Sequence, residues 1–123
     1  MADISELIGV TLTEIKNTQD RIEFISDCDK WAMYHIQDCC EAVYVADIIG
    51  DLQDLVGSPI VRAEENTSNQ DPKDFKRGKG DYYPESMTWT FYRIGTEKGT
   101  VVIRWCGESN GYYSESVEFS GII

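Results

Sequence analysis

The sequence lacks the features that usually mark secreted and membrane proteins. Its first residues, MADISELIGV, contain no basic segment followed by a long apolar run, so they predict no signal peptide. No stretch approaches the roughly 18 consecutive apolar residues that a membrane-spanning helix needs. These absences predict a cytoplasmic protein, in which the 4 cysteines would remain reduced thiols.

The sequence also has little of what catalysis commonly uses. It contains 1 histidine, His35, although histidine is the side chain that most often transfers protons near neutral pH. It has no phosphate-binding loop, no G-x-G-x-x-G fingerprint and no nucleophile elbow of the hydrolase type. We therefore expect a non-enzymatic protein with no catalytic residues and no cofactor.

Two minor alternatives use the cysteines. One is a Cys–His nucleophile, in which His35 would act on Cys39 or Cys40 and Asp38 or Glu41 would orient the histidine. Adjacent cysteines on a strand would point to opposite faces, which argues against a shared structural role for this pair. The other alternative is a small zinc site, although the usual C-x-x-C spacing is absent. Its candidate ligands are His35, Cys28, Cys39, Cys40 and Cys106.

The charge of the chain is strongly acidic. It has 22 Asp and Glu against 11 Lys and Arg, a formal net charge of −11. Such a charge repels nucleic acids and anionic membranes, so we expect neither as a direct partner. Basic residues gather locally within 71–81, inside a long polar loop at about 65–85 that shows no apolar period.

Alternation of apolar and polar residues predicts strands over most of the chain. We expect a single domain over residues 1–123 with a mainly β (β-rich α+β) fold. About seven largely antiparallel strands would form a sandwich, barrel or bent sheet, with one short helix near 51–56 between Asp51 and Gly57. The first three segments should form a meander, and those on either side of Gly95–Gly99 a hairpin. The candidate segments are Val10–Lys16, Arg21–Ile25, Trp31–Ile36, Glu41–Ile48, Ile60–Glu64, Met87–Ile94, Thr100–Cys106 and Tyr112–Phe119.

Two segments are dense in polar and aromatic side chains, Tyr34–Glu41 and Arg104–Glu115. Such residues at strand ends can build a pocket in which rings stack a base and polar groups read its edge. Alternatively, Trp105 and Tyr113 belong to the core and the other residues form ordinary turns. The sequence leaves both interpretations open.

The same segments carry a resemblance to a known family. The strings H-x-Q-D-C-C-E at residues 35–41 and R-W-x-G-x-S-N-G-Y-Y-S-E at residues 104–115 resemble an uncharacterised domain family that is common in bacteriophage and prophage genomes. The similarity covers roughly residues 8–119 and is poorest around residues 66–85. The resemblance implies a phage protein acting in the cytoplasm of the host cell, with a compact fold and no established activity.

Small phage proteins of this kind often counter host defences, which suggests two mechanisms. The first is sequestration of a nucleotide-type immune second messenger, and we rank it ahead. The second is mimicry of DNA, in which the acidic surface would inhibit a CRISPR or restriction nuclease. The partner would thus be a small nucleotide-like ligand or a host defence protein, and a homo-oligomer is compatible with either. Candidate ligand-binding residues are His35, Gln37, Asp38, Glu41, Arg104, Trp105, Asn110, Tyr112, Tyr113 and Ser114, with Lys76 and Arg77 as a lid.

Overall fold

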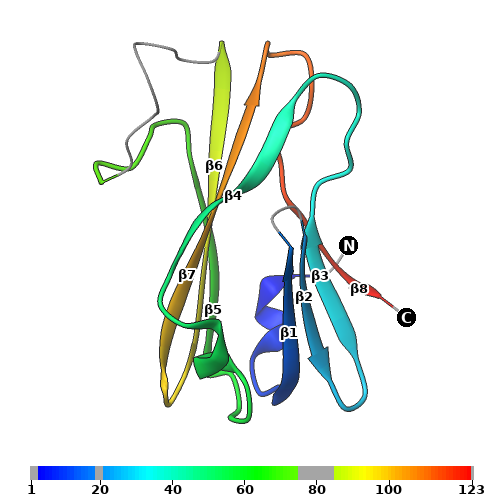
Figure 1. Cartoon of the computed structure of the whole chain (residues 1–123), viewed down its shortest axis with the longest axis vertical. Helices are drawn as coiled ribbons and strands as arrows, with labels where there is room; N and C mark the ends of the chain where they lie inside the picture. The colour runs from blue at the N-terminus through cyan, green and yellow to red at the C-terminus, as the bar shows by residue number, and fades with distance from the viewer. Residues whose placement is uncertain (1–2, 19–20, 75–84, 123) are drawn as a thin grey trace.

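The chain folds into two four-stranded antiparallel sheets that face each other (Figure 1). The computed structural model describes residues 3–18, 21–74 and 85–122. The first sheet has the order β1-β2-β3-β8 and the second β4-β7-β6-β5. The prediction of a mainly β fold is confirmed, and the sandwich is the arrangement adopted. The strands are β1 Leu12–Thr18, β2 Arg21–Ser26, β3 Lys30–Tyr34, β4 Ala42–Ile49, β5 Arg62–Ser68, β6 Ser86–Thr96, β7 Gly99–Ser109 and β8 Glu118–Ile122.

One hydrophobic cluster joins the two sheets. Phe24 and Met33 of the first sheet share it with Ile94, Ile103 and Trp105 of the second. Successive strand residues point to opposite faces, so the period-two pattern places one apolar face of each sheet in this cluster. Burial of each large side chain contributes roughly 1.5–3 kcal/mol, which makes the cluster the main source of stability.

The predicted local pairings are present. β1, β2 and β3 pair antiparallel as a meander. β6 and β7 form the expected hairpin, whose ladder runs from Ser86 opposite Ser109 to Thr96 opposite Gly99. The connection is shorter than the predicted Gly95–Gly99, because both glycines continue the ladder and only Glu97 and Lys98 turn the chain.

The short helix near 51–56 is present as a single 3₁₀ turn, η2 (Leu52–Leu55). The Asp51 carboxylate accepts a hydrogen bond from the backbone N–H of Gln53 at 2.9 Å, as expected of a capping residue. Gly57 follows with a φ of 87°, a left-handed conformation that favours glycine. A further 3₁₀ turn, η1 (Ile4–Leu7), was not predicted from the sequence.

Two predicted strands are displaced along the chain. Residues 110–117 form no strand, and β8 begins only at Glu118 and pairs with β3 in the opposite sheet. The strand predicted at Ile60–Glu64 begins at Arg62 and continues to Ser68, into the segment expected to be loop. β5 is the edge of its sheet, where polar side chains can face water on a paired strand, so its sequence shows no apolar alternation. Within the described ranges, no helix is long and apolar enough to cross a membrane.

Candidate functional site

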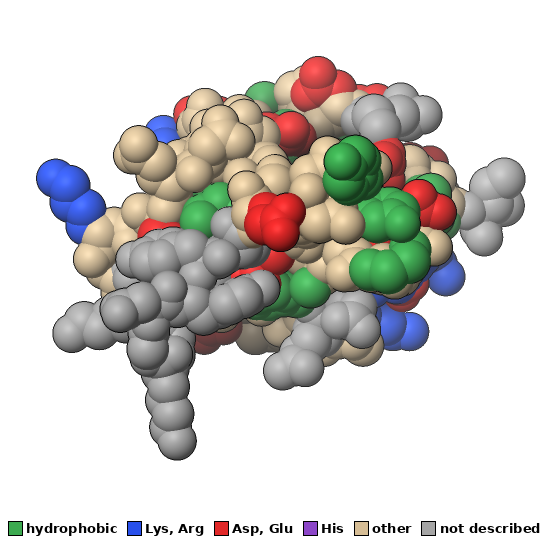
Figure 2. Space-filling model, turned by 90° about the horizontal axis from the view of Figure 1, so that it is seen from above, with side chains coloured by type: hydrophobic (Ala, Val, Ile, Leu, Met, Phe, Trp, Pro, Cys, Tyr) green, Lys and Arg blue, Asp and Glu red, His purple; other side chains and the backbone are tan. Residues whose placement is uncertain are grey.

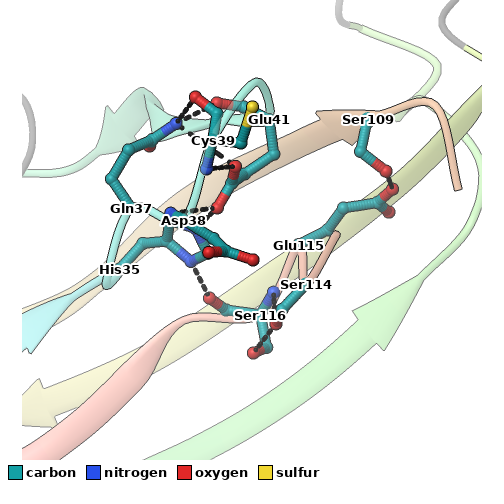
Figure 3. Close-up of polar contacts among 9 residues, drawn as sticks. All are labelled: His35, Gln37, Asp38, Cys39, Glu41, Ser109, Ser114, Glu115 and Ser116. Carbon is teal, nitrogen blue, oxygen red and sulfur yellow. Dashed lines mark hydrogen bonds and ion pairs between the residues drawn. The ribbon is translucent and has the colours of Figure 1, made fainter. Parts of the chain in front are cut away.

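Two connections between the sheets meet at one end of the sandwich. Residues 35–41 link β3 to β4, and residues 110–117 link β7 to β8. His35 Nδ1 lies 2.8 Å from the carbonyl oxygen of Ser116, so the two connections are in direct contact (Figure 3). The fold therefore brings together the two segments that the sequence singled out.

Glu41 is the centre of the first connection. Its buried carboxylate accepts hydrogen bonds from His35 Nε2 at 2.8 Å and from the backbone N–H groups of Asp38 and Cys39 at 2.8 and 2.9 Å. Gln37 Nε2 adds a longer contact of 3.3 Å and donates to the Glu41 carbonyl oxygen at 2.6 Å. The hydrogen bond from His35, followed by those from the backbone, lowers the Glu41 pKa from 4.5 to about 2. The carboxylate is therefore ionised at neutral pH.

His35 is held on both sides by acceptors. The carboxylate of Glu41 and the carbonyl oxygen of Ser116 can only accept hydrogen bonds, so the imidazole satisfies both when both ring nitrogens carry a proton. Both ring nitrogens are thus engaged, one by the Glu41 carboxylate and one by the Ser116 carbonyl oxygen. Neither ring nitrogen is left to accept a proton from Cys39 or Cys40.

Cys39 and Cys40 correct an expectation, because a disulfide joins them. The sequence predicted reduced thiols on opposite faces of a strand. Instead, the chain bends at these two residues before β4 begins, so strand alternation does not separate their sulfur atoms. Cys28 is an exposed thiol and Cys106 a buried one. Within residues 3–18, 21–74 and 85–122, no group of three His, Cys, Asp or Glu side chains is arranged to hold a metal ion.

Glu115 organises the second connection in a similar way. Its buried carboxylate accepts hydrogen bonds from Thr88 Oγ1 at 2.8 Å and from Ser109 Oγ. Ser109 Oγ in turn accepts from the backbone N–H of Gly111 at 2.9 Å. A Cβ at Gly107 would lie 2.5 Å from the Glu115 carbonyl oxygen, so this close approach requires glycine. Much of the second string thus has a structural role.

The remaining predicted residues do not converge on one pocket. Trp105 belongs to the core, and its Nε1 has no hydrogen-bond partner among the described residues. Asn110 Oδ1 accepts a hydrogen bond from the backbone N–H of Tyr112 at 3.1 Å, and the Tyr112 side chain is exposed. Ser114 pairs with Ser116, with their hydroxyl oxygens 2.7 Å apart. Tyr113 is half-buried, while Lys76 and Arg77 lie outside the described residues.

Arg104 lies on the other face of its sheet from the core. Its guanidinium makes a bidentate ion pair with Asp47, and its Nη1 lies 2.9 Å from Asp74 Oδ1. The hydrogen bonds that the guanidinium donates to these two carboxylates, first to Asp47 and then to Asp74, raise the Arg104 pKa further above its ordinary value. Neither aspartate was predicted as a site residue. Asp47 could have been found, because an acidic residue within the apolar segment EAVYVADI indicates a buried cationic partner.

A depression of about 430 Å³ opens beside the start of β4. Of the residues that line it, His35 and Gln37 were predicted site residues. Ala42, Val43 and Tyr44 were not, because their apolar alternation indicated only a strand. Figure 2, which looks onto this end of the sandwich, shows hydrophobic and acidic side chains together, with basic ones at the margin. The depression is lined by His35, Gln37, Ala42, Val43 and Tyr44.

Comparison with known proteins adds a family and no activity. The model of one family, described as a domain of unknown function (DUF7448), matches residues 5–119. No curated protein and no solved structure matches the chain.

Proposed function

The chain belongs to this family of domains of unknown function, DUF7448, and we propose its function from the geometry of its site. It is a non-enzymatic binding protein that takes up a nucleotide-like ligand in the depression beside β4. By holding the ligand without converting it, the protein lowers the concentration of a nucleotide-type second messenger of a host defence system.

The depression is the observation that carries this proposal. Its volume of about 430 Å³ lies within the range of small-molecule sites. Its lining combines an imidazole, an amide and a phenol with the apolar Ala42 and Val43. A heteroaromatic base needs both kinds of contact, since its faces are apolar and its edges form hydrogen bonds.

Binding without turnover agrees with how the polar groups are held. Both nitrogens of His35 are engaged, and the buried Glu41 is surrounded by four donors from its own loop. Groups fixed in this way form a rigid site and carry little capacity for proton transfer. The resemblance of the two strings to phage sequences supports the host-defence setting.

Thermal unfolding with a panel of ligands tests the proposal. Cyclic nucleotides, nucleosides or ADP-ribose derivatives that bind should raise the melting temperature, and the ligand should be recovered intact after denaturation. Ala42→Trp should abolish the rise, because the exposed Ala42 lines the depression and an indole would fill it. Thr67→Trp, on the exposed edge strand β5, is the matched control and should respond like the wild type. The proposal fails if no ligand shifts the transition, or if Ala42→Trp still responds.

A second candidate is inhibition of a nuclease by mimicry of DNA. It is favoured by the net charge of −11, which resembles the polyanionic surface of DNA. Such an inhibitor should bind a CRISPR or restriction nuclease with an affinity that falls steeply with salt. Ala42→Trp would retain that inhibition, which separates this candidate from the first.

A further inference from the structure

The outer face of the second sheet carries a buried layer of its own. Trp89 is fully buried yet lies outside the core cluster, because it points away from the core-facing Tyr92 and Ile94 of the same strand. Its ring stacks on Phe91, with centroids 6.0 Å apart and planes at 11°. Arg104 is the β7 partner of Phe91 in the ladder and belongs to this face.

A short segment with two aspartates, residues 69–74, is tied to this layer, and we name it the strap. Asn69 Nδ2 donates to the Met87 carbonyl oxygen at 3.2 Å. Asp71 Oδ1 accepts from the indole N–H of Trp89 at 2.9 Å, and Asp74 Oδ1 accepts from Arg104 Nη1 at 2.9 Å. The strap therefore places its carboxylates on an indole donor and on a guanidinium.

The two carboxylates on Arg104 are not equivalent. Asp47 pairs with it from the neighbouring strand through two hydrogen bonds, which already balance the charge of the guanidinium. Asp74 is a second anion on the same group, and its side chain is 65% exposed whereas that of Arg104 is 9% exposed. A guanidinium that is nine-tenths buried and holds a surplus, solvent-accessible carboxylate presents donors that suit a phosphate oxygen equally well.

The depression and Arg104 lie along the same pair of strands. Tyr44, which lines the depression, is opposite Cys106, and Asp47 is opposite Arg104. The register shift between Val45 and Asp47 keeps Tyr44 and Asp47 on the same face of β4, the face opposite the core. A ligand that enters the depression by its base can thus extend along β4 toward the guanidinium.

We infer that Arg104 is the phosphate-binding residue of this site. In the absence of ligand, the Asp74 carboxylate occupies the position of the phosphate on Nη1 and so competes with it. The inference rests on the proposed function for the class of ligand, a nucleotide. Binding of the phosphate displaces the Asp74 carboxylate from Nη1 while Asp47 keeps the guanidinium in place.

Titration with inorganic pyrophosphate, followed by calorimetry, tests this assignment. Asp74→Asn removes the competing charge and should bind pyrophosphate about tenfold more tightly than the wild type, a change of about 1.4 kcal/mol. Asp29→Asn makes the same change in net charge at the exposed turn between β2 and β3, so it should stay within about twofold of the wild type. Equal affinities for the two variants, or no gain in Asp74→Asn, would overturn the assignment.

A nucleoside separates this inference from the proposed function. Adenosine has no phosphate, so its effect on the melting temperature reports the depression, whereas the difference in pyrophosphate affinity between Asp74→Asn and Asp29→Asn reports the anion site at Arg104. A tenfold gain for pyrophosphate in Asp74→Asn supports the anion site even where adenosine has no effect. No gain overturns the anion site even where adenosine stabilises the protein.

Discussion

At the scale of single residues, two buried carboxylates hold the site together. Glu41 and Glu115 each lie in a connection between the sheets and are satisfied by donors from nearby. An ionised group without such partners would be expensive to bury, so the surrounding donors are what make these positions possible. His35 adds the contact between the connections through Ser116.

The Glu41 carboxylate predicts a loss of stability in acid. Its pKa is about 2 in the folded chain against an ordinary value of 4.5, so its contribution is fully present above pH 4.5 and disappears as the pH falls toward 2. Denaturant unfolding of the wild type and of Glu41→Gln should show a stability difference at pH 7 that shrinks over this interval.

Asp38→Asn is the control for that experiment. Asp38 is an exposed residue of the same connection, and it contributes its backbone N–H to Glu41. Its substitution should lower stability much less than Glu41→Gln at pH 7. A Glu41→Gln difference that stays constant from pH 7 to pH 2 would contradict the role given to this carboxylate.

The disulfide predicts a definite pattern of thiol reactivity. The chain has 4 cysteines, and Cys39 and Cys40 are bridged. Titration with a thiol reagent should therefore label only the exposed Cys28 in the native protein, and Cys106 as well after unfolding. All four should react once a dithiol reductant is added. Labelling of Cys39 or Cys40 without a reductant would show that the bridge is absent.

At the scale of elements, the two buried carboxylates lie in connections and the strands provide the frame. The hairpin β6–β7 carries Thr88, Gly107 and Ser109, which receive Glu115 from the segment leading to β8. A rigid frame with polar connections at its end is a common arrangement for binding proteins.

The close contact of Gly107 with Glu115 predicts that a larger residue at position 107 lowers stability. Gly107→Ala would place its Cβ 2.5 Å from the Glu115 carbonyl oxygen and 2.7 Å from its Cβ, so something must shift, at a cost of about 1–3 kcal/mol in unfolding free energy. Gly121→Ala is the control, because its nearest neighbour, the Lys30 carbonyl oxygen, is 3.8 Å away. Chemical denaturation of both variants measures the difference, and equal stabilities would contradict the packing.

At the scale of the whole molecule, one cluster of buried side chains spans both sheets. Small domains with a single core usually unfold in one cooperative step. The two sheets should therefore lose their structure together.

Truncation of the shared core tests this cooperativity. Ile103→Ala should lower the unfolding free energy by about 2–5 kcal/mol, whereas Ile36→Ala, at an exposed position, should change it by less than about 0.5 kcal/mol. Far-UV and near-UV circular dichroism should report the same transition in each variant. Separate transitions for the two signals would show that the chain does not unfold in a single cooperative step.

The sequence by itself determined what depends on neighbouring residues. Period-two alternation predicted the strands, and short connections predicted the β1–β2–β3 meander and the β6–β7 hairpin, because these pairings close over few residues. The string H-x-Q-D-C-C-E contains the whole hydrogen-bond cluster around the Glu41 carboxylate, since the donors to this carboxylate all come from within six residues of it.

Tertiary structure decided what depends on contacts between distant segments. His35 meets Ser116 across 81 residues, and Arg104 meets Asp47 across 57. No local pattern specifies such partners, so the sequence did not predict that Asp47 engages the Arg104 guanidinium on the outer face of the second sheet. The pairing of β8 with β3 has the same origin. It arises because the sandwich buries both sheets against one core, and that requirement acts on the whole chain at once.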